Sequence, residues 1–245
     1  MPNTFVIGDI HGGLRALHQV LERAKVTRED QLIFLGDYVD GWSESPQVLD
    51  FLIALKAKQE CIFIRGNHDE LVLDWLTGAH QNFDETLWFK HGGEATATAY
   101  SKVTEEHKRN HINFLKSLQN YHLDDKNRLF IHAGFTNMNG INYEYFPKLF
   151  YWDRTLWEMA LALDTTIPKE SKAFPKRLTL YHEIYIGHTP VTRIGETIPV
   201  NKACIWNVDT GAAFKGPLTI MNIDTKEYWQ SEPLSDLYFN EKGRN

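Results

Sequence analysis

The chain opens with an apolar run, a polar loop and a segment in which apolar residues recur at helical spacing. The run is Phe5-Val6-Ile7, and the helical positions after it are Leu14, Leu17, Leu21 and Ala24. β-branched and aromatic runs that end at glycine are typical of strands, and apolar residues three or four apart mark one face of a helix. The pattern predicts a strand, a loop and a helix in this order.

The same unit occurs twice more. Apolar residues 32–35 precede a helix for which Ser45 is the expected N-cap, with Pro46 at the first helical position. Residues 61–64 precede a third helix that continues past Val72. Three successive units of this kind predict a largely parallel sheet with helices packed on it. Ligands of such sheets gather at the carboxyl ends of the strands.

The rest of the chain completes an α/β architecture. Residues 84–120 read as a helical insertion, with Thr104 capping one helix. Strand-like runs return at residues 129–131, 184–186, 204–208 and 218–221, and they suggest a second sheet facing the first. Residues 156–181 contain prolines and scattered lysines, and we interpret them as a surface lid. We expect one domain over residues 1–245, because a boundary would divide the polar motifs that follow the strands.

Those motifs stand directly behind the apolar runs. They are Gly8-Asp9-Ile10-His11-Gly12, Gly36-Asp37-Tyr38-Val39-Asp40, Gly66-Asn67-His68-Asp69, His132-Ala133-Gly134 and Gly187-His188-Thr189-Pro190. Any one of them is a weak signal, since an aspartate after glycine is often a turn former and a lone histidine is often structural. All five in this order indicate a metal site. A mixed set of carboxylate, amide and imidazole ligands suits manganese, iron or zinc better than calcium.

The spacing also suggests how two ions are shared. Asp9 and His11 are two residues apart just past a strand, so one turn can aim both at the same ion. Asp37 ends the adjacent strand and is the natural bridging carboxylate. The second ion would be held by Asn67, His132 and His188. Two cations about 3.5–4 Å apart can share a hydroxide and stabilise an in-line displacement at phosphorus. This chemistry is phosphate ester hydrolysis without a covalent enzyme intermediate.

The remaining histidines receive no metal role. They lie mostly in helical or polar stretches, and they are His18, His80, His91, His107, His111, His122 and His182.

Composition narrows the class of protein. The formal charge of −6 argues against a general nucleic-acid binder, because affinity for a polyanion comes mainly from Lys and Arg. No apolar stretch approaches the roughly 20 residues that span a bilayer, so we expect no membrane insertion. The first motif begins without a preceding charged leader, and we expect a cytoplasmic protein. Oligomeric state is left open.

The motif series, from Gly8 to about Gly211, resembles the calcineurin-like metallophosphoesterases and specifically their phosphoprotein phosphatase branch. Within this branch, the chain is similar in length and in the form of its motifs to the bacterial and phage-type serine/threonine protein phosphatases and to the diadenosine tetraphosphatases. The resemblance implies a four-layer α-β-β-α sandwich of two mixed β-sheets flanked by helices. It also implies a dinuclear metal site at the sheet edges, for which we rank manganese first and iron and zinc as alternatives.

The resemblance assigns a role to individual residues. The first metal's ligands match Asp9, His11 and Asp37, and the second metal's ligands match Asp37, Asn67, His132 and His188.

Further roles carry over by position. His68 matches the histidine that protonates the leaving oxygen, and Asp40 would orient its ring and favour its charged form. Arg65 and Arg154, together with Asn67, match residues that bind phosphate oxygens. For Arg154 a plain surface arginine is the alternative interpretation.

One position departs from the family pattern. The family usually reads Gly-Asp-x-Val-Asp-Arg-Gly, and here Gly41 stands at the arginine position, followed by Trp42. Losing a cationic donor to the phosphoryl group costs roughly two to three orders of magnitude in rate if nothing replaces it. Trp42 at the rim could stack on a flat group such as a nucleobase, or pack as an exposed loop side chain on its own helix.

We therefore expect a metal-dependent phosphomonoesterase of the serine/threonine protein phosphatase type, acting on a phosphorylated protein. One alternative is a dinucleoside polyphosphate hydrolase acting on a nucleotide, because the same core serves both. Another is a catalytically silent scaffold, which would need neither His68 nor Asp40.

Overall fold

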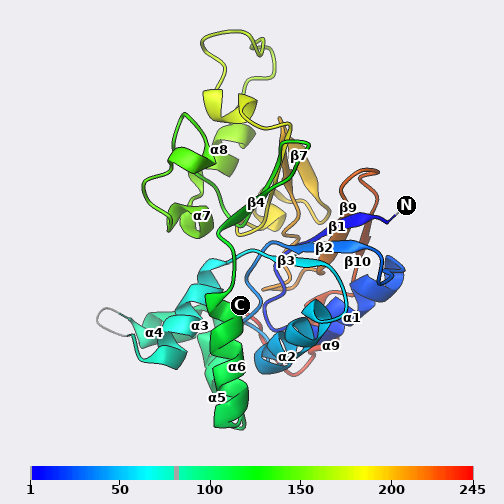
Figure 1. Cartoon of the computed structure of the whole chain (residues 1–245), viewed down its shortest axis with the longest axis vertical. Helices are drawn as coiled ribbons and strands as arrows, with labels where there is room; N and C mark the ends of the chain where they lie inside the picture. The colour runs from blue at the N-terminus through cyan, green and yellow to red at the C-terminus, as the bar shows by residue number, and fades with distance from the viewer. Residues whose placement is uncertain (1, 80–82, 245) are drawn as a thin grey trace.

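The computed structural model describes residues 2–79 and 83–244, whose strands form two five-stranded sheets (Figure 1). The first sheet has the order β10-β9-β1-β2-β3. Its strands are β1 (Thr4–Ile7), β2 (Gln31–Phe34), β3 (Cys61–Phe63), β9 (Thr219–Asn222) and β10 (Tyr228–Gln230). Strands β1, β2 and β3 are parallel, because a helix returns the chain after each of the first two; β9 and β10 extend the sheet antiparallel.

The second sheet has the order β4-β5-β6-β8-β7. Its strands are β4 (Tyr121–Leu123), β5 (Arg128–Ile131), β6 (Glu183–Ile186), β7 (Val200–Lys202) and β8 (Ile205–Asn207). The three central strands are parallel, and the two edge strands are antiparallel to their neighbours. Both sheets are therefore mixed, as expected.

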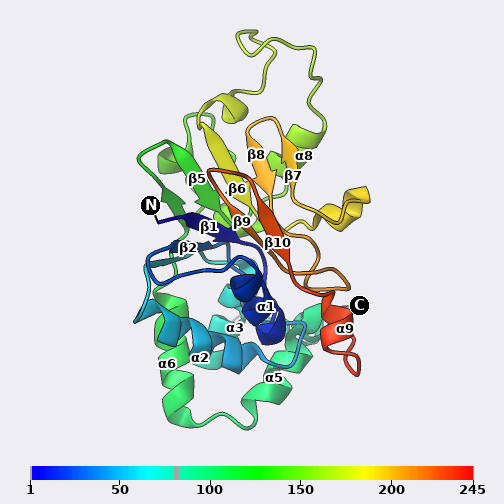
Figure 2. The same cartoon turned by 90° about the vertical axis from the view of Figure 1, so that its right-hand side faces the viewer.

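Helices cover the outer faces of both sheets (Figures 1 and 2). On the first sheet lie α1 (Leu14–Arg23), α2 (Ser45–Lys56), α3 (Asn67–Thr77), α5 (Glu94–Tyr100), α6 (Glu105–Lys116) and α9 (Leu234–Leu237), with α4 (Glu85–Trp88) beside α3. On the second lie α7 (Leu149–Trp152) and α8 (Thr155–Leu161). Short irregular turns of helix are η1 (Phe89–Gly93), η2 (Ile141–Tyr143), η3 (Lys176–Thr179) and η4 (Val191–Ile194).

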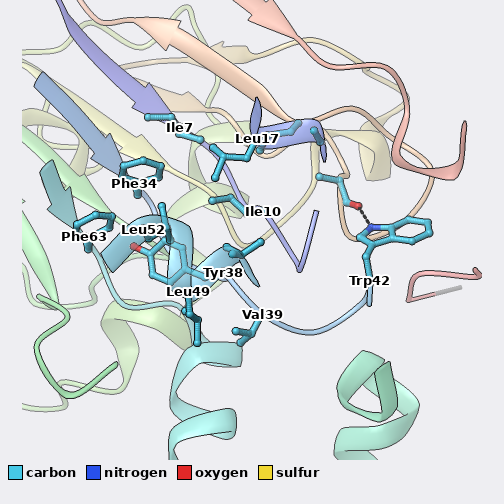
Figure 3. Close-up of a cluster of buried hydrophobic side chains, with 14 of the residues drawn as sticks. Ile7, Ile10, Leu17, Phe34, Tyr38, Val39, Trp42, Leu49, Leu52 and Phe63 are labelled. Atoms are coloured by element: carbon cyan, nitrogen blue, oxygen red, sulfur yellow. Dashed lines mark hydrogen bonds between the residues drawn. The ribbon is translucent and has the colours of Figure 1, made fainter. Parts of the chain in front are cut away.

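Three buried apolar clusters hold these layers together. Between the sheets, Val6 and Ile33 of the first meet Phe130 and Tyr185 of the second, whose rings stack 4.9 Å apart. A larger cluster joins the first sheet to its helices, and Figure 3 shows part of it around Tyr38. The third joins the second sheet to α7 and α8. This order of helix, sheet, sheet and helix confirms the expected α-β-β-α sandwich.

The local predictions are confirmed where the apolar signal is long. Predicted strands and helices agree with β1–β3 and α1–α3, and Thr104 caps α6 by accepting a hydrogen bond from His107 N. The run at 218–221 is a strand, but it pairs with β1 in the first sheet rather than in the second. Strands β4, β7 and β10 have only three residues each and were not predicted, because so short a segment shows no period.

The predicted N-cap of α2 is wrong. Ser45 is the first helical residue, and its side chain makes no capping hydrogen bond. Its Oγ accepts a hydrogen bond from Asp40 N at 3.1 Å and lies 2.9 Å from Thr96 Oγ1. Ser45 therefore stabilises the loop before the helix.

Both interpretations of Trp42 are also wrong. The side chain is fully buried, its Nε1–H donates to Ala212 O at 2.7 Å, and its ring stacks on Tyr238 at 5.2 Å (Figure 3). Trp42 therefore joins the loop after β2 to the segment that follows β8, and it has no surface to offer a substrate.

The segment predicted as a lid projects from the end of the molecule that carries α8 (Figures 1 and 2). Its base is anchored, since Trp157 of α8 and Leu178 of η3 are buried against the second sheet. Movement of this segment stays a prediction. No helix in the described residues is long and apolar enough to cross a bilayer.

Candidate metal centre and catalytic cleft

The six predicted metal ligands lie together where the strands of both sheets end. Their residues follow β1, β2, β3, β5 and β6, and all six side chains are buried: Asp9, His11, Asp37, Asn67, His132 and His188. Three of them have left-handed backbone, with φ of 52° at His11, 50° at Asp37 and 66° at His188. Such conformations are uncommon outside glycine and concentrate at functional sites.

Asp9, His11 and Asp37 form the first ligand group. Their ligand atoms all lie within 4.8 Å of one another. His11 Nδ1 lies 3.1 Å from Val39 O, so this nitrogen carries the proton and donates it to the carbonyl. The lone pair of His11 Nε2 then faces two carboxylate oxygens, Asp9 Oδ2 at 3.8 Å and Asp37 Oδ2 at 3.5 Å.

The second group contains Asp37, Asn67, His132 and His188. His132 Nδ1 donates to Leu35 O at 2.8 Å, which leaves Nε2 facing Asn67 Oδ1 at 3.2 Å and Asp37 Oδ2 at 3.4 Å. His188 Nδ1 lies 2.9 Å from the same Asn67 oxygen. Asp37 Oδ2 therefore belongs to both groups, as expected for a bridging ligand.

This arrangement fits two cations. In each group, acceptor atoms converge on one another, and acceptors repel unless a proton or a metal ion lies between them. The side chains of Asp9 and His188 each retain a buried polar atom, Oδ1 and Nε2, without a hydrogen-bond partner in the described chain.

The pKa shifts of the ligand side chains also indicate that this site needs positive charge. Burial raises the pKa of Asp9 well above its usual range, and the nearby Asp209 carboxylate adds to the rise. Burial opposes the charged form of His132, yet Asp37 and Asp9 outweigh it and raise the pKa of His132 to about 10. A proton on His132 thus stands where a metal ion would, while burial lowers the pKa of His11 and His188 well below the usual value and keeps both neutral.

A third group of possible metal ligands differs from these two, because hydrogen bonds within the group satisfy its polar atoms. Asp50, His107 and His111 also come within 4.8 Å of one another, although the sequence gave these histidines no role. Here one acceptor, Asp50 Oδ1, faces two donors, His111 Nε2 at 3.0 Å and His107 Nδ1 at 3.2 Å. Hydrogen bonds satisfy this group, so it needs no cation.

Close packing at two glycines sets the ligand positions. A Cβ at Gly187 would overlap Asp9 Oδ1, and a Cβ at Gly66 would overlap Asp37 Oδ1. Only glycine lets the backbone approach these carboxylates so closely. Asp69 holds the same region together, because its carboxylate accepts hydrogen bonds from the backbone N–H groups of Gly66 and Asp37 at 2.7 and 2.9 Å.

The predicted acid, His68, sits beside the metal ligands. Its Nδ1 lies 2.7 Å from Asp40 Oδ2, and both side chains are buried. Trp88 of α4 donates its indole N–H to the same Asp40 oxygen at 2.7 Å. The sequence analysis missed Trp88, because a tryptophan in a helical insertion carries no local signal of such a bond.

The arginines divide into two groups. Arg154 lines the cleft over His11, Asp37 and His68, and its Nη1 donates to Thr189 Oγ1 at 2.8 Å. Arg65 is absent from the described cleft lining, and its Nη2 donates to Leu115 O at 3.4 Å, so the structure does not bring Arg65 to the cleft.

Three further charged residues line the cleft and were missed: Asp209, Arg193 and Arg244. Asp209 follows the apolar run at 204–208, so the pattern that found Asp9 and Asp37 could have found it. Its pKa is raised to about 6, mainly by burial. Arg193 and Arg244 have no comparable sequence signal.

A cavity of about 600 Å³ opens beside the cleft. Its lining includes His68, Trp88, Trp152, Phe83 and Leu87. Arg154 and Arg244 line both this cavity and the cleft. Aromatic side chains therefore lie next to the group predicted to protonate the leaving oxygen. His80, which was given no metal role, lies outside the described residues.

Known proteins match this chain along most of its length. The family model for calcineurin-like phosphoesterases matches residues 2–209. An asymmetrical bis(5'-nucleosyl)-tetraphosphatase, PrpE of Anoxybacillus flavithermus, is 27% identical and aligns over 98% of this chain and 97% of its own. Serine/threonine-protein phosphatase 1 of Salmonella typhimurium is 26% identical over 90% of this chain and 92% of its own.

Solved structures share the fold. A structure described as a putative diadenosine tetraphosphatase has a TM-score of 0.62 at 17% identity and covers 94% of this chain and 95% of its own. A protein serine/threonine phosphatase from Saccharomyces cerevisiae has a TM-score of 0.58 at 14% identity, covering 94% and 80%.

Proposed function

The chain belongs to the calcineurin-like phosphoesterase family, and we propose that it hydrolyses phosphate esters with two divalent cations held where the strands of its two sheets end. The observation that carries this proposal is the convergence of acceptor atoms on both sides of Asp37 Oδ2. Asp9, His11 and Asp37 would hold one cation, and Asp37, Asn67, His132 and His188 the other. When bound, such a pair supplies an activated water and neutralises charge on the phosphoryl group.

The protein's own groups would complete the reaction. His68 would donate a proton to the leaving oxygen, because its Nδ1 is held by Asp40 and its Nε2 remains available. Arg154 would bind phosphoryl oxygens from the cleft wall, where its Nη1 is fixed by Thr189. Burial of the ligands and of His68 keeps bulk water away from the reacting atoms.

Manganese is the cation that we rank first, with iron and zinc as alternatives. Carboxylate and amide oxygens favour manganese, whereas the three imidazoles also suit iron and zinc. Removal of metal by a chelator followed by addition of single metals would rank them by recovered activity.

A phosphoserine or phosphothreonine peptide is the first substrate candidate. The Salmonella relative is named a serine/threonine-protein phosphatase, and it aligns over nine tenths of this chain. An alkyl oxygen is a poor leaving group, and His68 would supply the proton that it needs.

A dinucleoside polyphosphate is the second candidate, and one structural observation favours it. The cavity beside His68 is lined by Trp88, Trp152 and Phe83, and its volume of about 600 Å³ is in the range of small-molecule sites. A nucleotide leaving group would place its flat base there. The PrpE relative is named for this substrate class.

Two assays test these proposals. The first measures hydrolysis of p-nitrophenyl phosphate and of phenyl phosphate with added manganese for the wild type and His68→Asn. We expect activity in the wild type. In the variant we expect a loss of at least about 10²-fold with phenyl phosphate, whose leaving oxygen needs a proton, and a smaller loss with p-nitrophenyl phosphate. A fully metallated wild type without activity on any phosphoester would instead support the scaffold alternative.

The second assay compares kcat/KM for a phosphopeptide and for diadenosine tetraphosphate. A value far higher for the nucleotide would reject the first substrate candidate, and the reverse would reject the second. Trp152→Ala serves as the internal check, because removing an aromatic wall of the cavity should affect the nucleotide more than the peptide.

A further inference from the structure

Gly41 lies beside the metal-ligand candidate His11. It stands where the family pattern has an arginine, and its φ is 103°, a conformation that side chains rarely adopt. A Cβ built on Gly41 would lie 3.5 Å from His11 Cβ and 3.5 Å from Arg244 Cγ. Apart from His11, the nearest side chain to this position is that of Arg244, about 200 positions later in the chain.

The side chain of Arg244 passes over two glycines, Gly41 and Gly92, on its way to the cleft. Its Cγ would lie only 2.7 Å from a Cβ at Gly92, whose φ is 100°. Gly41 N donates to Gly92 O at 3.0 Å, so the two glycines form one surface. A side chain at Gly92 would collide with Arg244, and one at Gly41 would touch it.

The segment before Arg244 is fixed to the loop after β2. Ser43 donates to the Glu241 carboxylate from its N at 2.9 Å and from its Oγ at 2.7 Å. A Cβ on Gly243 would lie 2.7 Å from Trp42 Cζ2, and Arg244 N donates to Ala213 O at 2.9 Å. These contacts hold the backbone of Arg244 in place, so the direction of its side chain is set by buried packing.

The guanidinium of Arg244 donates no hydrogen bond to the described residues. Its Nε is buried without a hydrogen bond, and its Cζ lies 5.3 Å from the centroid of the Phe214 ring. It lines the cleft together with His11, Asp37 and Arg154. An arginine that served only the fold would be expected to satisfy its donors within the protein, since buried donors without partners are destabilising.

We propose that Arg244 is a phosphate-binding residue that replaces the arginine missing at Gly41. Its guanidinium donates paired hydrogen bonds to the non-bridging phosphoryl oxygens, on the same cleft wall as Arg154. The inference rests on the proposed function, because it assumes that the cleft receives a phosphoryl group. Under this proposal, the contacts that anchor residues 241–244 also serve catalysis, because they hold the side chain that binds the substrate.

The test compares Arg244→Ala and Arg244→Lys with the wild type. Lys242→Ala is the matched control, because it removes the same charge from an exposed side chain of the same segment. Three quantities are measured for each protein: kcat/KM for p-nitrophenyl phosphate, affinity for inorganic phosphate by calorimetry in manganese, and bound manganese. Thermal unfolding verifies that each variant is folded.

We expect Arg244→Ala to lose about 10²-fold in kcat/KM and at least about 10-fold in phosphate affinity, with bound manganese unchanged. Arg244→Lys should fall between, because an ammonium keeps the charge and loses the paired geometry. Guanidinium at millimolar concentration should restore part of the activity of Arg244→Ala only. Lys242→Ala should behave as the wild type.

Phosphate affinity within twofold of the wild type in Arg244→Ala would overturn the proposal, as would a loss that follows loss of manganese and is not restored by guanidinium. The binding measurement keeps the two proposals separate. If the wild type hydrolyses no phosphoester, the proposed function fails, while the change in phosphate affinity still decides the role of Arg244.

Discussion

The indole N–H of Trp88 donates a hydrogen bond of 2.7 Å to Asp40 Oδ2. The same oxygen lies 2.7 Å from Nδ1 of His68, so one carboxylate oxygen serves both side chains. Asp40 N is also held, since it donates to Thr96 Oγ1 at 3.0 Å. A helix from the insertion over the first sheet thereby holds the Asp40 carboxylate beside the predicted acid, and we expect Trp88 to act as a positioning residue for His68.

Trp88→Phe is predicted to slow the reaction in a way that depends on the leaving group. The variant keeps an aromatic ring and removes the donor to Asp40, and loss of such outer hydrogen bonds typically costs 10–100-fold. We expect kcat for phenyl phosphate, a poor leaving group, to fall about 10-fold. For p-nitrophenyl phosphate, which needs little protonation, it should fall less than about threefold.

Trp75→Phe is the matched control for this experiment, because the Trp75 ring packs 5.2 Å from that of Trp88 and, in the part of the chain that the structure describes, donates no hydrogen bond to Asp40. Both rates should change equally in the control. An equal fall for the two substrates in Trp88→Phe would mean that the effect is only structural.

Gly187→Ala is predicted to remove metal. The added Cβ would overlap Asp9 Oδ1, so the carboxylate must leave its position. Bound manganese, measured by atomic emission, should fall from about two to about one per chain, and activity should fall by at least about 10²-fold. Gly195→Ala is the control, because it strains a left-handed backbone position with φ of 82° and places its Cβ within 4 Å of no other atom, so it should keep both ions. Two ions retained in Gly187→Ala would contradict the assignment of Asp9.

The sequence predicts those site residues that directly follow a recognisable strand. Asp9 and Asp37 come directly after strands, so once the strands are recognised their side chains must lie at one edge of a sheet. Arg244 lines the cleft and Trp88 lines the cavity beside it. Both come from segments that are distant in the chain, and their positions follow from tertiary packing. Ser45 illustrates the same limit of sequence-based prediction. Its residue type favours an N-cap, but its hydroxyl instead accepts a hydrogen bond from Asp40 N, a contact that depends on the tertiary structure.

Trp42→Phe is predicted to destabilise the fold by about 1–3 kcal/mol. The variant leaves Ala212 O without its donor in a buried site, and it removes part of the stacking on Tyr238. Urea unfolding measures the change. Trp152→Phe, at a partly exposed position, should change the free energy of unfolding by less than about 0.5 kcal/mol. Equal stability of Trp42→Phe and the wild type would show that the buried contact contributes little.

His111 is predicted to make stability depend on pH. Burial lowers the pKa of His111, although its bond to Asp50 opposes the shift. The geometry agrees, since Tyr100 Oη lies 2.9 Å from His111 Nδ1 and can donate to the neutral ring. The unfolded chain takes up a proton near the ordinary value of 6.5, whereas the folded chain does so only at lower pH. Stability from this group is thus present above pH 6.5 and is lost as the pH falls toward the folded value.

The measurement is the free energy of unfolding in urea between pH 8 and 5.5, for the wild type and for His111→Gln. Other buried histidines also contribute, His11 and His188 with the same sign and His132, whose pKa is raised, with the opposite sign. The difference between the two curves isolates His111. The wild-type curve should fall more steeply below pH 6.5, by no more than the limit of about 1.4 kcal/mol per pH unit for one proton. Parallel curves would show that His111 is not held neutral by the fold, because a residue with an ordinary pKa adds no pH dependence to stability.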